Sequence, residues 1–278
     1  MDEEQEKPKI EIEKVDIIGP VAETAPEETA QTKVALPTFD KESWNPKTLL
    51  GKKVKSGEIS NIDSILDNGM KILESELVDV LVPDLETELL MAGQSKGKFG
   101  GGKRRIFRQT QKKTKEGNKP HFATIAVVGN RDGYIGLGYG KSKETVPARE
   151  KSIKNAKLNL FKIRRGCGSW QCDCKQPHSI PFEVSGKCGS VKVILMPAPK
   201  GSGLKVEKEC QKILSLAGIK DVWSRTSGQT RSKINHINAC EDALRNLMST
   251  KVNEMDIKNT GIREGSIKEI GVEENKNE

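Results

Sequence analysis

The sequence predicts an α+β protein in which two α+β units follow one another between acidic ends. Residues 95–165 contain strand patterns followed by a long helical pattern, and residues 180–251 combine further strands with amphipathic helices. The third observation is the distribution of charge. The net charge of the 278-residue chain is +8, yet residues 1–31 carry −7 and residues 252–278 carry −3. The middle of the chain therefore carries +18, which is typical of a protein that binds a polyanion.

The N-terminal third is predicted to contain an acidic tail and a helical extension. Residues 1–36 are acidic, contain prolines and lack periodicity, so we expect them to be disordered. Within the extension, residues 37–94, apolar side chains recur at helical spacing in NIDSILDNGMKILESELVDVLV, which begins at Asn61. Gly69 is expected to kink or divide this helix, and Pro83 to end it. We expect one or two further helical turns in DLETELLMA.

Residues 95–165 are predicted to form the first α+β unit. They begin with a segment rich in lysine and arginine, residues 95–119, which contains ten cations and one acid. HFATIAVVGN is then expected to be a strand that turns at residues 130–133 into a second strand, Tyr134–Leu137. A helix is expected over residues 143–163. The residues on its apolar face are Val146, Ile153, Ala156 and Leu160.

The stretch GYIGLGYGKS, residues 133–142, contains a Gly-Lys-Ser but lacks the spacing of a phosphate-binding loop. Such a loop needs glycine at position 135, which is Ile135, and a dinucleotide fingerprint needs glycine at position 141, which is Lys141. We therefore expect these glycines to end a strand that leads into a helix. The free N–H groups at a helix N-terminus favour anions, so a phosphate of an RNA backbone would fit there.

Residues 180–251 are predicted to form the second α+β unit. IPFEVSGKCGSVKVILMPA is typical of two strands joined by a Gly-Lys turn, and residues 197–203 form a loop rich in proline and glycine. The helix Val206–Ala217 is expected to end at Gly218.

A last helix, Asn235–Met248, is expected after a short strand and turn in DVWSRTSGQ. Its inward residues are predicted to be Ile237, Ala243, Leu244 and Leu247. Cys210 and Cys240 lie on apolar helix faces and are expected to be small core residues. Residues 252–278 are expected to be a second acidic tail, disordered like the first.

The linker between the two units, residues 166–179, is rich in cysteine. Its candidate metal ligands, which occur within twelve residues, are Cys167, Cys172, Cys174 and His178. Thiolates and imidazole at this density suit a tetrahedral zinc ion, although the spacing differs from paired C-x-x-C knuckles. Cys188 could supply the fourth ligand in place of His178. The acidic N-terminus MDEEQEK is the reverse of a secretory signal and indicates an intracellular protein, where clustered cysteines favour metal binding or free thiols over disulfides.

Composition argues against a membrane protein and against an enzyme for small molecules. No window approaches 18 apolar residues, and aromatic residues make up only 4% of the chain, too few for large aromatic pockets. The histidines His121, His178 and His236 have no serine or cysteine at the spacing of a catalytic triad. We therefore expect no catalytic residues.

Several segments together resemble one known family. These are VVGNRDGYIGLGYGKSKE, AKLNLFKIRRGCGSWQC, PHSIPFEVSGKCGSV, LMPAPKGSGL and LAGIKDV. They resemble the universal small-subunit ribosomal protein family S-five in its archaeal and eukaryotic branch, over roughly residues 60–250 and in the same order. The resemblance implies a double-stranded-RNA-binding-like domain followed by a β-α-β domain with a left-handed crossover.

The resemblance also implies function and partners. It implies a cytoplasmic structural constituent of the small ribosomal subunit that binds rRNA near the decoding region, supports subunit assembly and influences the accuracy of translation. The implied partners are the small-subunit rRNA, messenger RNA where it enters the subunit, and the ribosomal proteins S-four and S-eight. The fold implied for the second domain is shared with small-molecule kinases, so a nucleotide-binding enzyme is the alternative. In those kinases a Ser-Ser helix start and a magnesium-binding carboxylate follow the phosphate loop, whereas Leu204-Lys-Val-Glu follows PAPKGSG here.

RNA affinity is expected to come mainly from residues 96–119 rather than from the glycine turn. The segment at residues 93–107 is extra relative to shorter family members. In the family the loop between the first two strands is rich in arginine, and here KTKEGNKPHF keeps its charge in lysines, while Pro120 and His121 replace cations. The predicted RNA-binding residues are Lys96, Lys98, Lys103, Arg104, Arg105, Arg108, Lys112, Lys113, Lys115, Lys119, Arg131, Lys141, Lys143, Arg164, Arg165 and Lys200.

Overall fold

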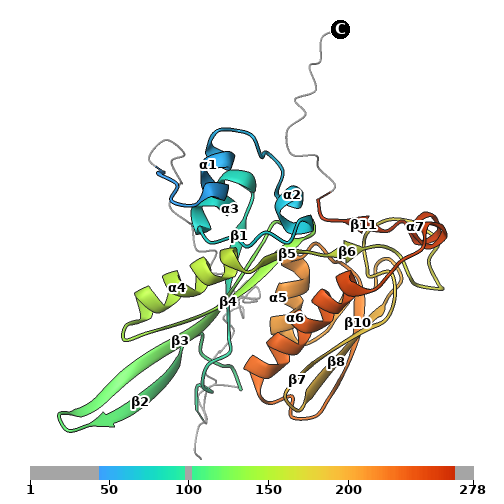
Figure 1. The fold of residues 1–278 in the computed structure, drawn as a ribbon. Coiled ribbons are helices and arrows are strands. Elements are labelled where there is room, and N and C mark those ends of the chain that lie inside the picture. Colours follow the sequence, from blue (N-terminus) through green and yellow to red (C-terminus); the bar gives the residue numbers. More distant parts are fainter. Residues whose placement is uncertain (1–43, 98–101, 267–278) are drawn as a thin grey trace, which may run out of the picture. The chain divides into compact units, whose positions relative to one another are not determined.

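The computed structural model describes residues 44–97 and 102–266 of the chain (Figure 1). All of them fall in one compact unit, Lys33–Glu278. The acidic segment of residues 1–36 lies outside the described residues. No helix of the described part is long and apolar enough to cross a membrane.

Three short helices form the N-terminal extension: α1 (Leu49–Lys55), α2 (Ile62–Asp67) and α3 (Ser75–Leu81). The predicted long helix is divided as expected, because Gly69 has a left-handed backbone with φ of 64°. The helix α1 was not predicted; the Thr48 side chain caps it by accepting a hydrogen bond from the Gly51 N–H. The three helices bury their apolar faces in a small core of their own that also includes Tyr134.

The first sheet contains five strands. They are β1 (Glu86–Leu90), β2 (Arg108–Thr114), β3 (Gly117–Gly129), β4 (Tyr134–Ser142) and β5 (Leu160–Lys162). Their order is β1-β3-β4-β5, with β2 paired to the other half of β3. The prediction of helical turns in DLETELLMA was wrong. Residues 86–90 form an edge strand because they pair antiparallel with residues 125–129, a partner that is distant in sequence.

Gly136, Gly138 and Gly140 of GYIGLGYGKS lie inside β4, so the prediction that these glycines end a strand was wrong. The helix α4 (Thr145–Leu158) packs directly on this strand. A Cβ atom on Gly136, Gly138 or Gly140 would collide with backbone atoms of α4. The glycines therefore allow close packing of helix and strand and do not cradle a phosphate. The helix also ends earlier than predicted, since Leu160 belongs to β5, and Val146 is 54% exposed.

The second sheet has the order β7-β8-β10-β9. Its strands are β7 (Val184–Cys188), β8 (Val191–Pro197), β9 (Leu204–Lys205) and β10 (Val222–Ser227). The helices α5 (Lys208–Leu216) and α6 (Lys233–Ser249) were predicted over nearly the same residues. The turn between β7 and β8 is at Gly189, not at the predicted Gly186-Lys187 pair. Gly186 lies inside β7 opposite Val193, and glycine is needed there because a Cβ would collide with the backbone of α6.

The two α+β units share one hydrophobic core. Buried residues of the first sheet, such as Ile125 and Leu137, belong to the same cluster as Leu195, Leu214 and Leu244 of the second unit. Cys210 and Cys240 are fully buried in it, as predicted. The expected inward residues of α6 are buried there as well.

Part of the predicted C-terminal tail is structured. The helix α7 (Glu254–Thr260) is followed by β11 (Arg263–Glu264), which pairs with β6 (Arg164–Arg165) (Figure 1). The expectation of disorder from residue 252 was therefore wrong for these elements. Because β6 comes from the first unit, this pairing attaches the C-terminal segment to the body of the protein.

Candidate nucleic-acid interface and metal centre

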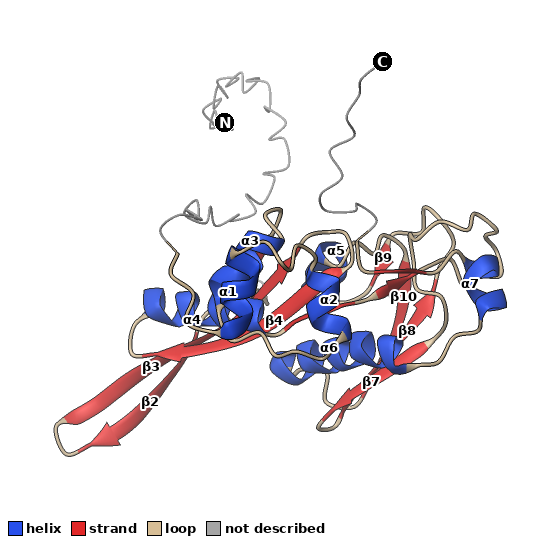
Figure 2. Cartoon of the chain, turned by 45° about the horizontal axis from the view of Figure 1, so that its top comes forward, coloured by secondary structure: helices blue, strands red, loops and turns tan. Residues whose placement is uncertain are grey.

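The hairpin formed by β2 and β3 is a cationic ribbon. Beyond Phe122, which pairs with Ser142 of β4, the ribbon consists of these two strands, and it extends away from the rest of the sheet (Figure 2). Its exposed cations are Lys112, Lys113, Lys115 and Lys119. Lys112 lies directly opposite Lys119 in the register, and like charges in this position destabilise a hairpin. Lys119 pairs with Glu116 at 3.0 Å on the surface, and an RNA backbone would neutralise the remaining lysines of the ribbon.

The cationic loop before β2 is folded back on itself. The Lys96 N–H donates to the Lys103 carbonyl at 3.0 Å, and the Arg105 N–H donates to the Gln94 carbonyl at 2.8 Å. Lys103, Arg105 and the nearby Arg108 are exposed and available to a ligand. Lys98, also predicted to bind RNA, lies outside the described residues.

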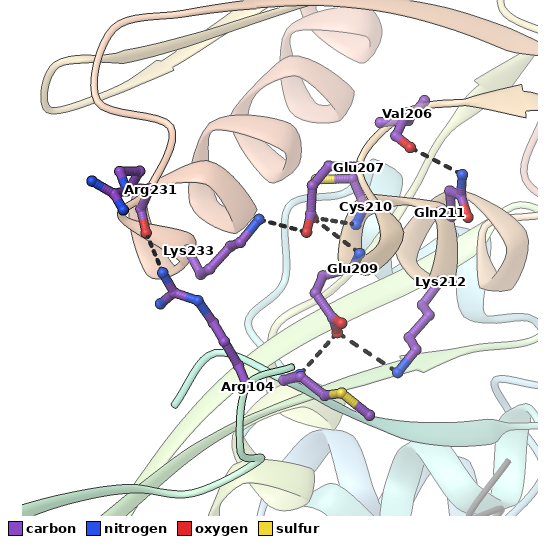
Figure 3. Close-up of polar contacts among 10 residues, drawn as sticks. Arg104, Val206, Glu207, Glu209, Cys210, Gln211, Lys212, Arg231 and Lys233 are labelled. Carbon is purple, nitrogen blue, oxygen red and sulfur yellow. Dashed lines mark hydrogen bonds and ion pairs between the residues drawn. The ribbon is translucent and has the colours of Figure 1, made fainter. Parts of the chain in front are cut away.

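Arg104 points the other way and docks this loop on the second unit. Its guanidinium donates a hydrogen bond of 2.9 Å to the backbone carbonyl of Arg231, just before α6 (Figure 3). The side chain is half-buried. The structure therefore gives Arg104 a positioning role, which the charge pattern alone could not distinguish from RNA binding.

The remaining predicted cations lie in different surroundings. Lys141 and Lys143 are exposed around the end of β4, and the exposed Lys200 donates to the Gln176 side chain at 3.0 Å. Arg131 pairs with Glu86 at 2.8 Å on the surface. These four stay predictions as RNA ligands.

Two arginines of β6 are engaged inside the protein. Arg164 is half-buried, pairs with Glu264 at 2.6 Å and donates to the backbone carbonyls of Leu247 in the last turn of α6 and of Thr250 just after it. Arg165 is 3% exposed, pairs with Asp132 at 2.7 Å and donates to the Gly265 carbonyl at 3.0 Å. A guanidinium buried in this way has no free face for a phosphate, so the structure does not support the predicted RNA-binding role of Arg165.

The four predicted metal ligands converge. The ligand atoms of the set Cys167, Cys172, Cys174 and His178 lie within 4.8 Å of one another. The backbone brings the ends of this loop together through reciprocal hydrogen bonds between Gly166 and Ser179. Gly168 is needed here because a Cβ would collide with the Pro181 carbonyl. Cys188 is not part of the group, so the structure favours His178 as the fourth ligand.

Asp221 orients the histidine of this group. Its Oδ2 lies 2.8 Å from Nδ1 of His178, while Oδ1 accepts a hydrogen bond from the Gly203 N–H at 2.8 Å. The other ring nitrogen, Nε2, faces the Cys172 sulfur at 3.9 Å. A carboxylate behind a ligating histidine is the usual arrangement in zinc sites. Sequence reasoning missed Asp221, because it lies 43 positions after His178 and no spacing pattern connects them.

The electrostatics of the cluster suit a metal that needs thiolate ligands. The backbone N–H of Lys200, followed by contacts with Cys174, lowers the pKa of Cys172 to about 6. Burial and the neighbouring thiols raise the pKa of Cys167 to about 11. The Cys172 thiol therefore loses its proton easily, whereas the Cys167 thiol keeps its proton. A bound cation would stabilise the cysteine ligands as thiolates.

Comparison with known proteins gives one consistent result. The family model described as "Ribosomal protein S5, N-terminal domain" matches residues 106–164, and "Ribosomal protein S5, C-terminal domain" matches residues 186–258. The chain is 53% identical over 226 residues to the small ribosomal subunit protein uS5 of Nanoarchaeum equitans, and these residues are 81% of the chain and 97% of the relative. It is 47% identical to the uS5 protein of Methanobrevibacter smithii, covering 81% of the chain and 99% of the relative.

Proposed function

Because this chain belongs to the ribosomal protein S5 family, we propose that it works as a structural, rRNA-binding constituent of the small ribosomal subunit. Proteins of this family are structural, and the kinase alternative has no observation in its favour. The observation that carries the RNA-binding role in this chain is the cationic ribbon of β2 and β3, whose exposed lysines outnumber its one acid, Glu116, which pairs with Lys119.

We infer the folds of the two domains from the family resemblance. The antiparallel strands β2, β3 and β4 followed by α4 support a double-stranded-RNA-binding-like first domain. The parallel neighbours β9 and β10, joined through α5, support a β-α-β unit in the second, for which the family implies a left-handed crossover. We place the protein near the decoding region and the point where messenger RNA enters, beside S-four and S-eight, on the strength of the family resemblance.

The RNA-binding role is tested by removing the charge of the ribbon. In the triple variant Lys112→Ala, Lys113→Ala, Lys115→Ala, the logarithm of affinity for small-subunit rRNA should depend less steeply on the logarithm of salt concentration. The slope should fall by about three units, since each phosphate contact contributes about 0.9. The three side chains are exposed, so the thermal unfolding midpoint should not change. Filter binding over a series of KCl concentrations measures the slope.

A matched control uses exposed lysines of the N-terminal extension. Replacing Lys52, Lys53 and Lys71 by alanine removes the same charge from another surface and should leave the slope nearly unchanged. Lys141→Ala should reduce it by about one unit at most. An equal loss in the triple variant and this control would mean that the ribbon contributes only to the net charge.

The cysteine cluster would hold a structural zinc ion. Three sulfurs and one imidazole nitrogen make a complete tetrahedral donor set, and the Asp221 carboxylate already fixes the orientation of His178. The ion would stabilise a loop that has few apolar residues, because Trp170 at its tip is 89% exposed and contributes no core packing.

Elemental analysis of protein purified without chelator should find about one zinc per chain. The variant Asp221→Asn should weaken zinc affinity about 10- to 100-fold by removing the charge behind His178. Asp173→Asn removes an exposed acid of the same loop and should bind zinc normally. Metal-free protein in which Cys167, Cys172 and Cys174 react freely with a thiol reagent would refute the zinc site.

A further inference from the structure

A groove in the second unit, separate from both sites above, has the properties of an anion site. It lies where the edge strand β9, the strand β10 and the first turn of α6 meet, and its volume is about 480 Å³. Its lining includes Ser224, Thr226, Thr230, Lys233 and His236.

His236 is the unusual residue of this groove. Its side chain is only 3% exposed, and neither ring nitrogen has a hydrogen-bond partner in the described structure. The contact with the Cys210 sulfur raises the pKa of His236, and burial opposes this effect. Burying a polar group without a partner is unfavourable, so a ligand that exchanges hydrogen bonds with the ring would be favoured here.

The start of α6 adds a second set of donors. This helix has 17 residues, its first turn contains no acid, and no side chain caps its first N–H groups. The chain reaches it from β10 through the loop GQTRS, residues 228–232. Gly228 in this loop has φ of 83°, and a Cβ there would collide with the Ser190 carbonyl. Strand, glycine loop and helix N-terminus together are an arrangement that binds phosphate.

The one acid of the groove is already neutralised. Glu207 accepts from the Lys233 ammonium at 2.7 Å and from the N–H groups of Glu209 and Cys210 at the start of α5 (Figure 3). Although burial opposes it, the Lys233 contact lowers the pKa of Glu207, so the pair is a carboxylate with an ammonium. The Arg104 guanidinium, held on the Arg231 carbonyl, adds a cation near α6. The surroundings therefore favour an anion.

We propose that this groove binds a backbone phosphate of single-stranded RNA, with His236, Thr230 and the first N–H groups of α6 as donors. Polar hydroxyls rather than aromatic rings line the groove, which suits a phosphate and ribose better than a stacked base. The site is distinct from the ribbon of β2 and β3, so an RNA strand could be held at two places on one protein.

The test measures the NMR signals of the His236 ring. The chain contains three histidines, so ¹⁵N-histidine labelling of the full-length protein gives three sets of ring signals that single substitutions assign. Hexauridylate, inorganic phosphate and the nucleoside uridine are titrated separately at constant ionic strength. Hexauridylate should shift the ring signals of His236, phosphate should do so more weakly, and uridine should not. Thr230→Val should weaken the hexauridylate effect about ten-fold.

The controls separate this site from the other proposals. Lys192 pairs with Ser227, the neighbour of the groove residue Thr226, so its side chain lies on the opposite face of the second sheet. The variant Lys192→Ala should therefore leave the His236 shift unchanged. The triple variant of the ribbon should also keep it, even if total RNA affinity falls. An unchanged His236 signal with hexauridylate, an equal shift with uridine, or a response to phosphate without one to hexauridylate would each overturn the proposal.

Discussion

Replacing Gly138 by alanine is expected to destabilise the protein by about 3 kcal/mol, the upper part of the usual range for overpacking. The new methyl group would meet the Ser152 carbonyl oxygen and the backbone of Ala156, whose Cα would lie 2.8 Å away. Both belong to α4, and backbone atoms cannot rotate aside as a side chain can. Urea denaturation of the full-length protein measures the change in the free energy of unfolding.

A glycine in open surroundings is the matched control. Gly201 has φ of 88°, and a Cβ there would meet no atom within 4 Å. Gly201→Ala should therefore cost only the strain of the left-handed conformation, about 1 kcal/mol. If Gly138→Ala costs no more than this, α4 does not lie as close to β4 as the structure has it.

The variant Asp132→Ala is expected to lower the free energy of unfolding by about 3 kcal/mol, because it leaves the buried Arg165 guanidinium without its anionic partner. Arg165 would keep only the Gly265 carbonyl as a partner among its observed contacts. Asp132 also accepts a hydrogen bond of 2.6 Å from the Ser266 hydroxyl, so the C-terminal segment should loosen at the same time. Urea denaturation measures the first effect, and faster amide hydrogen exchange in residues 262–266 the second.

A surface pair next to it provides the comparison. Glu86→Ala removes the partner of Arg131, whose side chain is 47% exposed, and should cost less than about 1 kcal/mol. The double variant Asp132→Ala, Arg165→Met should regain part of the stability lost in Asp132→Ala. Equal costs for Asp132→Ala and Glu86→Ala would show that Arg165 is accessible to water, and its predicted role in RNA binding would become tenable again.

The helices of the second unit were predictable because their signals are local. The apolar spacing along α6 marks one face, and that face is fully buried at Ile237, Ala243 and Leu247. The end of α5 was predictable from Gly218, whose φ of 83° favours glycine strongly. In both cases the sequence of the helix and of the residue that follows it is enough to predict the structure.

Elements that depend on distant partners were not predictable in this way. DLETELLMA has enough apolar residues for a helix, and it is a strand because residues 125–129 offer it hydrogen bonds. Gly186 and Gly189 suit a turn equally well in sequence. The approach of α6 to Gly186 decides between them, and α6 begins more than forty residues later.

The same distinction holds for the sites. The four metal ligands were found because they lie within one short loop, whereas Asp221 belongs to a different part of the chain. The charge pattern identified the cations but not their directions. Arg104 and Arg165 look like RNA ligands in sequence, and each is held by protein atoms in the fold.

The ribbon of β2 and β3 has a consequence for newly made protein that has not yet joined a subunit. Beyond Phe122 both of its edges are open among the described strands, and open edges invite pairing between copies and hence aggregation. Lysines along an edge prevent this, because two such edges repel each other. The charges that later attract RNA would thus keep free copies apart until nucleic acid neutralises them, and replacing them by alanine would lower solubility as well as affinity.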